Sequence, residues 1–146
     1  MEIEIRRATS ADLSAVSSLW QRCYSIPWSD AAIENEINDA SSVFLVAMAG
    51  GALVGYALMK YAVGEGELCN IAVEPEQRRL GAGRALVSEL LCVAKSLGLD
   101  VVMLEVRASN DAAISLYENA GFERVGMRKN YYRAPREDAY LYNYYL

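Results

Sequence analysis

Proton transfer in this chain must rely on carboxylates, tyrosine, lysine, cysteine or water, because none of its 146 residues is histidine. This absence excludes a serine–histidine–aspartate triad, a cysteine–histidine pair and a histidine-ligated zinc site. We find no other metal-ligand pattern. Glu105 and Tyr117 are the two residues whose types and positions suit acid–base chemistry.

Glu105 and Arg107 lie on one face of an apolar strand predicted over residues 101–106, because side chains alternate along a strand. They stand at its carboxyl end, where open α/β sheets bind ligands. Apolar neighbours raise the pKa of a carboxyl group, which suits a general base. An ion pair between the two side chains is an equally good interpretation.

Tyr117 lies on the apolar stripe of a predicted helix, together with Ala113, Leu116 and Ala120. By itself this position favours an ordinary core tyrosine whose hydroxyl is hydrogen-bonded.

Residues 71–86 combine a strand, an exit at Pro75, a basic turn with two glycines, and a helix. The free N–H groups and the dipole of a helix N-terminus favour an anion, and Gly81 and Gly83 let the backbone approach it. Arg78, Arg79 and Arg84 add positive charge. The spacing matches neither the phosphate loop of NTPases nor the dinucleotide fingerprint. We predict a phosphate or pyrophosphate site; the alternative is a tight helix entry with solvated arginines.

The loop Arg78-Arg79-Leu80-Gly81-Ala82-Gly83 resembles the R/Q-x-x-G-x-G/A loop of the GNAT N-acetyltransferase superfamily. The resemblance implies that the backbone of this loop, with Arg84, binds the pyrophosphate of acetyl-coenzyme A. It also implies that Ile71, Ala72 and Val73 bind the pantetheine arm. Because it spans the chain, it implies a single α/β domain over residues 1–146. Its mixed, mostly antiparallel sheet would be flanked by about four helices, in the order β-α-α-β-β-β-α-β-α-β-β.

A second motif is similar to the family pattern N-x(5)-L-Y-x-x-x-G-F, from Asn110 through Leu116-Tyr117 to Gly121-Phe122. The resemblance implies that Tyr117 protonates the departing coenzyme A thiolate and binds the coenzyme, that Asn110 contacts the coenzyme arm, and that Glu105 accepts a proton.

Four short motifs resemble the branch of this family that acetylates the N-terminal alanine of a small-subunit ribosomal protein. They are Leu104-Glu105-Val106-Arg107-Ala108-Ser109-Asn110, Asn130-Tyr131-Tyr132, Arg136-Glu137-Asp138-Ala139 and Pro27-Trp28-Ser29. The resemblance implies a peptide N-terminus as partner, with Trp28, Tyr131 and Tyr132 in loops beside it, although each could simply pack on its own domain. An acidic rim would suit a cationic ribosomal tail. The tyrosine-rich C-terminal strand departs from this branch.

Three alternative functions remain open. The first is acetylation of other protein N-termini or of a small amine. The second is a coenzyme-A-binding module without turnover. The third is ATP binding by the glycine loop, which the missing Gly-Lys-Ser/Thr opposes.

Composition limits the partners and the compartment. Lys and Arg total 14 and Asp and Glu total 19, so a net charge of −5 argues against direct nucleic-acid binding. Three dispersed cysteines and a charged N-terminus indicate a cytoplasmic protein. The uncharged stretch 40–59 is long enough to span a membrane, but Gly50-Gly51 in its middle favours a hairpin. Nothing indicates the oligomeric state.

The elements that must position these residues are readable from spacing and caps. We predict a strand over 2–6, and a helix from Thr9 with Asp12 as capping-box partner, stopped by Pro27. Ser29 caps a second helix. The remaining expected elements are a strand over 67–73, a helix over 81–97, a helix from Ser109 or Asn110 to Gly121, and strands over 122–128 and 139–146.

Overall fold

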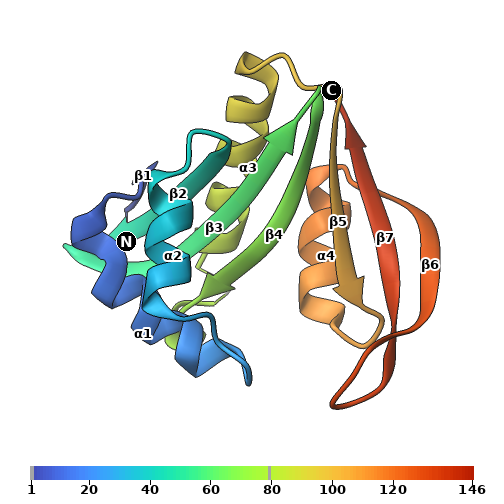
Figure 1. Ribbon diagram of the computed structural model, residues 1–146, viewed down its shortest axis with the longest axis horizontal. Coiled ribbons are helices and arrows are strands. Elements are labelled where there is room, and N and C mark those ends of the chain that lie inside the picture. Colours follow the sequence, from blue (N-terminus) through green and yellow to red (C-terminus); the bar gives the residue numbers. More distant parts are fainter. Residues whose placement is uncertain (1, 79) are drawn as a thin grey trace.

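A seven-stranded sheet forms the centre of the computed structural model, which describes residues 2–78 and 80–146. Its strand order is β1-β2-β3-β4-β5-β7-β6, and β4 with β5 is the one parallel pair among these strands (Figure 1). The strands are β1 (Ile3–Arg7), β2 (Ser42–Ala49), β3 (Ala52–Ala62), β4 (Glu65–Val73), β5 (Val101–Arg107), β6 (Glu123–Tyr132) and β7 (Glu137–Tyr145).

The helices are α1 (Leu13–Cys23), α2 (Asp30–Asn38), α3 (Ala82–Ser96) and α4 (Asp111–Ala120), with short 3-10 turns at Ser10–Asp12 and Pro75–Gln77. This order of elements confirms the predicted one. Ser29 caps α2 by accepting a hydrogen bond from the Ala32 N–H, and Gly121 ends α4 with a positive φ of 106°.

The uncharged stretch forms the predicted hairpin. Gly50 and Gly51, with φ values of 59° and 82°, connect β2 and β3, which pair antiparallel along most of their length. Among the described residues, no helix is long and apolar enough to cross a membrane.

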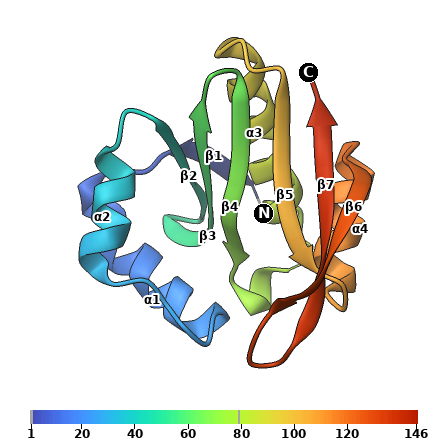
Figure 2. The ribbon, with the colours of Figure 1, turned by 45° about the vertical axis from the view of Figure 1, so that its right-hand side comes forward.

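Two hydrophobic clusters lie on opposite faces of the sheet. The larger contains α3 residues such as Leu86 and Leu90 together with Val102 and Leu104 of β5. The second contains Trp20 of α1 and Ile33 of α2, and its strand members come from β2, β3 and β4. Helices α1 and α2 therefore cover this face only as far as β4, and leave β5, β7 and β6 uncovered on that side (Figure 2).

Strands β4 and β5 pair over three residues and then separate. The pairs join Glu65–Glu67 to Val101–Met103; beyond them β4 stays with β3 while β5 stays with β7 (Figure 1). The β3–β4 register shifts so that Cys69 has no partner, and such a bulge bends and twists its strand. We call the region between Ile71–Val73 of β4 and Glu105–Arg107 of β5 the fork.

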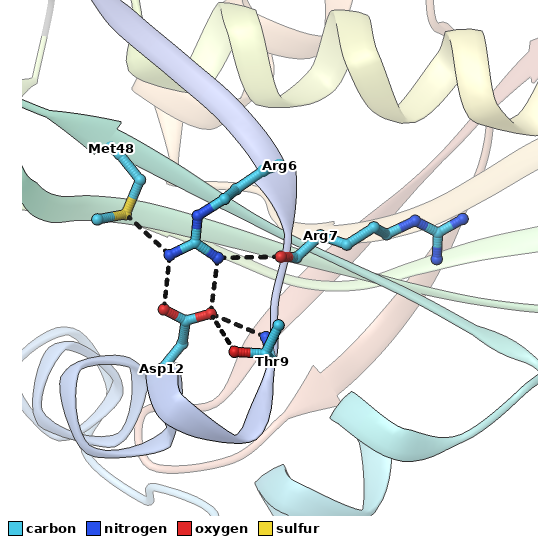
Figure 3. Close-up of polar contacts among 5 residues, drawn as sticks. All are labelled: Arg6, Arg7, Thr9, Asp12 and Met48. Atoms are coloured by element: carbon cyan, nitrogen blue, oxygen red, sulfur yellow. Dashed lines mark hydrogen bonds and ion pairs between the residues drawn. The ribbon is translucent and has the colours of Figure 1, made fainter.

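A bidentate ion pair fixes the start of α1 against β1 (Figure 3). Arg6 Nη1 and Nη2 each donate to the Asp12 carboxylate at 2.8 Å, and Asp12 Oδ2 also accepts from the Thr9 N–H at 2.8 Å. The Thr9–Asp12 capping box is therefore present as predicted. The hydrogen bonds from Arg6 lower the pKa of Asp12. The other end of α1 lies beside the fork, where Tyr24 contacts Ile71.

Candidate active site

Glu105 lies on the uncovered face of β5, at one side of the fork. Glu67 pairs with Met103, and Met103 shares a face with Glu105, so the two carboxylates point to the same side of the sheet. Glu105 Oε2 is buried and has no hydrogen-bond partner among the described residues. A buried carboxylate oxygen without a partner is costly, so it is available to accept a proton or hydrogen bond from a ligand.

Arg107 does not pair with Glu105, so the ion pair considered from sequence does not form. Its guanidinium pairs with Glu137 at 3.3 Å, and it donates to the carbonyl oxygens of Pro135 at 3.0 Å and Arg133 at 3.3 Å. It also lies 4.3 Å from the Tyr132 ring centroid. Arg107 thus anchors the β6–β7 connection, and Glu105 has no ion-pair partner among the residues that the structure describes.

Tyr131 and Tyr132 are the last two residues of β6, so the prediction that they lie in a loop is wrong. The ladder with β7 carries β6 beyond the predicted end at residue 128. The neighbouring Glu105 carboxylate raises the pKa of Tyr131, and the negative charge of Glu67 adds to this effect. Burial, followed by the charge of Glu105, raises the pKa of Tyr132 to about 12. The charge of Glu105 therefore acts on both phenols.

Tyr117 is 5% exposed, on the face of α4 that packs against the sheet. Burial raises the pKa of its hydroxyl, and nearby Tyr24 and Tyr132 add to the rise. The ring packs on Phe122 with centroids 5.8 Å apart. Within the described part of the chain its hydroxyl makes no hydrogen bond, so the expectation of a core tyrosine is met by the ring but not by the hydroxyl. The protonated Tyr117 hydroxyl is therefore available to donate a hydrogen bond or a proton to a ligand.

Asn110 caps α4. Its Oδ1 accepts from the Ala113 N–H at 3.2 Å, while Ser109 uses its own N–H to donate to Glu137 Oε2 at 2.6 Å. The cap therefore belongs to Asn110 and not to Ser109, and Asn110 is exposed at the carboxyl end of β5, beside the fork. A coenzyme contact through its amide nitrogen stays a prediction.

The backbone of β4 presents donors to the fork. In an antiparallel ladder, alternate residues direct both their N–H and C=O groups away from the partner strand. The Glu74 N–H donates to Val54 of β3, so Ile71 and Val73 are the residues that face away from β3. Tyr24 and Arg78, which lie outside the β3–β4 ladder, donate to the carbonyls of Ile71 and Val73 respectively, in agreement with this orientation. Ala72 is 6% exposed and belongs to the second hydrophobic cluster.

The glycine loop leads into the N-terminus of α3. Gly81 has a φ of 96°, which side-chain-bearing residues rarely adopt, and no side chain of the described residues caps the helix. The first helical hydrogen bond runs from the Ala85 N–H to the Gly81 carbonyl, so the N–H groups of residues 82–84 have no partner in the helix. A Cβ on Gly83 would lie 3.3 Å from Leu116, so this glycine also lets α3 approach α4.

The arginines of this loop have different environments. Arg78 Nε donates to the Val73 carbonyl at 3.3 Å, so part of its guanidinium is bound to its own chain. Arg84 lines a groove between α3 and the end of β7, with Lys95 and Tyr144. Leu80 is 58% exposed, and Arg79 lies outside the described residues.

Trp28 stacks on Trp20 with centroids 4.9 Å apart. This contact favours the alternative that Trp28 packs on its own domain, although 40% of the side chain is exposed.

Two residues near the site were not predicted. Glu67 shares the uncovered face with Glu105, and its charge acts on Tyr131. Tyr24, the first residue after α1, donates from its hydroxyl to the Ile71 carbonyl at 2.7 Å. No local sequence signal marks either residue, because strand register places the first and helix packing places the second.

Comparisons with known proteins agree with this geometry. The model of the acetyltransferase (GNAT) family matches residues 13–122. The [ribosomal protein bS18]-alanine N-acetyltransferase of Escherichia coli K12 is 37% identical over 134 residues, which is 90% of each chain. An N-alpha-acetyltransferase RimI of Mycobacterium tuberculosis is 43% identical over 118 residues, covering 78% of this chain and 73% of that one.

Solved structures have the same fold. The crystal structure of the ribosomal-protein-S18-alanine N-acetyltransferase from Escherichia coli has a TM-score of 0.89 at 34% identity, covering 97% of this chain and 92% of that one. Ard1 from Thermoplasma volcanium also has a TM-score of 0.89, at 28% identity, covering 100% of this chain and 99% of that one. These likenesses confirm the resemblance expected from the glycine loop and from the order of elements. The chain belongs to the GNAT acetyltransferase family and is an acetyl-coenzyme-A-dependent N-acetyltransferase.

Proposed function

We propose that this enzyme transfers the acetyl group of acetyl-coenzyme A to the N-terminal amine of a protein, with the N-terminal alanine of a small-subunit ribosomal protein as its main substrate. The observation that carries the proposal is the unpartnered, buried Oε2 of Glu105 at the fork. Similarity to relatives named for bS18-alanine acetylation supports the choice of substrate.

The residues beside the fork fit the coenzyme. The open first turn of α3 offers N–H groups and a positive dipole end to a pyrophosphate, and Gly81 leaves that turn uncovered, with nothing within 4 Å of where its Cβ would lie. The outward N–H group of Val73 and the outward carbonyl of Ile71 suit an extended arm that contains amides, which leaves the Ile71 N–H for the acetyl group. When bound, acetyl-coenzyme A supplies the activated acetyl thioester.

Glu105 and Tyr117 handle the protons. As the amine forms its C–N bond and the C–S bond breaks, Glu105 takes the proton that nitrogen loses, directly or through a water. Tyr117 supplies the proton that sulfur gains. An α-amino group titrates at about 7.7–8.0, so Glu105 needs only moderate basicity. The Ile71 N–H stabilises the negative charge that develops on the acetyl oxygen.

The uncovered face beside β5 suits an incoming peptide. Glu67 and Glu105 lie on it, and the charges of both carboxylates act on Tyr131. Negative charge at this position attracts an ammonium group and favours peptides with cationic residues after the first. A ribosomal substrate would be met in the cytoplasm.

The test uses acetyl-coenzyme A with two peptides of equal length: one with a free N-terminal alanine and no lysine, and one with a blocked N-terminus and internal lysines. Mass spectrometry locates the added acetyl group. We expect acetylation of the free alanine only. Acetylation confined to lysine, or coenzyme binding without turnover on either peptide, contradicts the proposal.

A second candidate is acetylation of a wider range of protein N-termini, which the similarity to the mycobacterial N-alpha-acetyltransferase favours. A peptide panel that varies the first residue separates the two. Similar kcat/KM for alanine, serine and methionine would select the wider activity.

A further inference from the structure

Tyr24 joins the end of α1 to the fork. Its hydroxyl donates to the Ile71 carbonyl oxygen at 2.7 Å, and its ring lies 6.4 Å from the Trp20 ring, centroid to centroid. Trp20 in turn stacks on the buried Tyr56 at 5.1 Å. The Tyr24 ring is therefore tilted against a Trp20 that is itself stacked on the core, and its hydroxyl binds one peptide group of β4.

That peptide group lies where the sheet no longer restrains β4 on both sides. Pairing between β4 and β5 ends at Glu67 and Met103, so no strand of the described chain pairs with the outer edge of Ile71. The corresponding carbonyl of Val73 is bound by Arg78 Nε at 3.3 Å, with Cys23 Sγ 3.9 Å away. The end of α1 and the glycine loop thus bind both outward carbonyls, and leave the two outward N–H groups facing the fork.

We propose that Tyr24 is a positioning residue for acetyl transfer: by binding the Ile71 carbonyl it fixes the orientation of this strand edge, so that the Ile71 N–H points at the acetyl oxygen. This proposal rests on the proposed function. The N–H and C=O of one strand residue point the same way, so a restraint on the carbonyl also restrains the N–H. A carbonyl oxygen has two lone pairs, so a coenzyme amide can still bind Ile71 while Tyr24 does.

The test substitution is Tyr24→Phe, which keeps the ring and removes the hydroxyl. Tyr61→Phe is the matched control, because the Tyr61 hydroxyl also donates to a backbone carbonyl, that of Ala40 at 3.1 Å, on an element away from the fork. Loss of a whole oxyanion donor costs about 10²–10³ in kcat, and a misdirected donor costs less, so we expect Tyr24→Phe to lower kcat about tenfold. We expect its dissociation constant for coenzyme A, and the kcat of Tyr61→Phe, to stay within about twofold of wild type.

A second measurement does not depend on activity. In the free protein, the carbonyl ¹³C chemical shift of Ile71 should move in Tyr24→Phe and stay unchanged in Tyr61→Phe. An unmoved shift overturns the contact. A moved shift with wild-type kcat overturns the positioning role. A parallel change in kcat and coenzyme affinity, in either direction, overturns it in favour of a coenzyme contact.

Failure of the proposed function gives a different result. A wild-type protein that acetylates no peptide N-terminus overturns that function, and this role with it. An active wild type matched by Tyr24→Phe overturns this role alone.

Discussion

Two residues with opposite surroundings divide the proton chemistry between them. Glu105 has a buried oxygen without a partner at an open sheet face, while Tyr117 is 5% exposed with its ring in the core. Burial raises the pKa of Tyr117, so the phenol keeps its proton until a stronger base, such as a thiolate, develops beside it. Tyr117 therefore starts as the protonated phenol that an acid requires, and the Glu105 oxygen without a partner is placed to accept a proton.

We expect Glu105→Gln to lower kcat by about 10²–10³, because the amide cannot accept the amine proton. Steady-state kinetics with an alanine-initiated peptide, together with calorimetry of coenzyme A binding, should show lost turnover with retained affinity. Glu89→Gln, an exposed glutamate on α3, is the control. Wild-type kcat in Glu105→Gln from pH 6 to 9 would rule out the base assignment.

We expect Tyr117→Phe to lower kcat at least about tenfold, because sulfur must then leave without a proton donor. The raised pKa keeps the wild-type phenol protonated across neutral and mildly alkaline pH, so its deprotonation should add no falling limb to kcat below pH 9. A kcat–pH profile of both proteins checks this. Equal rates for the two proteins would remove Tyr117 as the acid.

At the scale of elements, the β6–β7 hairpin depends on one side chain from β5. Arg107 binds two carbonyls of the connection, pairs with Glu137 and covers the ring of Tyr132. The hairpin carries Tyr131 and Tyr132, whose pKa values the charge of Glu105 raises. Tertiary contacts of one arginine therefore shape the part of the site that we propose binds the peptide.

We expect Arg107→Lys to raise the peptide KM roughly three- to tenfold, because the ammonium group of lysine cannot make the several contacts that the planar guanidinium makes at once. Coenzyme affinity should not change. Arg124→Lys is the matched control, since Arg124 lies 4.4 Å from the Tyr140 ring centroid but away from Glu105. An unchanged peptide KM, or an equal rise in both variants, would contradict the role of Arg107.

We expect Gly81→Ala to weaken coenzyme A binding, because alanine is strained at a φ of 96° and the turn before α3 must change. Gly98→Ala is the control: Gly98 has a φ of 74°, lies just past the other end of α3, and also has nothing within 4 Å of where a Cβ would lie. Each variant should lose about 1–2 kcal/mol of stability. Calorimetry should show lost coenzyme affinity in Gly81→Ala only. Equal coenzyme affinities in Gly81→Ala and Gly98→Ala would show that this loop does not bind the coenzyme.

At the scale of the whole molecule, the Arg6–Asp12 pair connects the edge of the sheet to the helix that ends beside the fork. The pKa of Asp12 is lowered from 3.8, mainly by hydrogen bonds from Arg6. A carboxyl group with a lowered folded pKa contributes stability above its unfolded pKa, and this contribution is lost as pH falls through the folded value.

We therefore expect Asp12→Asn to reduce the free energy of unfolding at pH 7 by about 1 kcal/mol. The loss comes from the weakened cap and the lost ion pair, and it is small because solvent screens the ion pair at the part-exposed Arg6. The difference from wild type should shrink below pH 3.8. Urea unfolding from pH 7 to 3 measures it. A difference that does not vary with pH would assign the effect to packing.

Local sequence rules predicted most element positions. The capping box at Thr9, the cap at Ser29, the glycine pair at 50–51 and the stop at Gly121 all act within a few residues, so the sequence shows them directly. The end of β6 was missed because pairing with β7 extends it to Tyr132, and no local residue marks that end.

The sequence by itself determined which chemistry is available. Without histidine it left carboxylates, tyrosine, lysine, cysteine or water to move protons, and its glycine loop indicated an anion site at a helix N-terminus. Tertiary structure decided which of these groups are free to act. In the folded chain Arg107 pairs with Glu137 of the hairpin and not with Glu105, and the Tyr24 hydroxyl donates to the Ile71 carbonyl. Strands β4 and β5 separate after three paired residues. These outcomes depend on strand register and on contacts between residues distant in the chain, which local spacing does not contain.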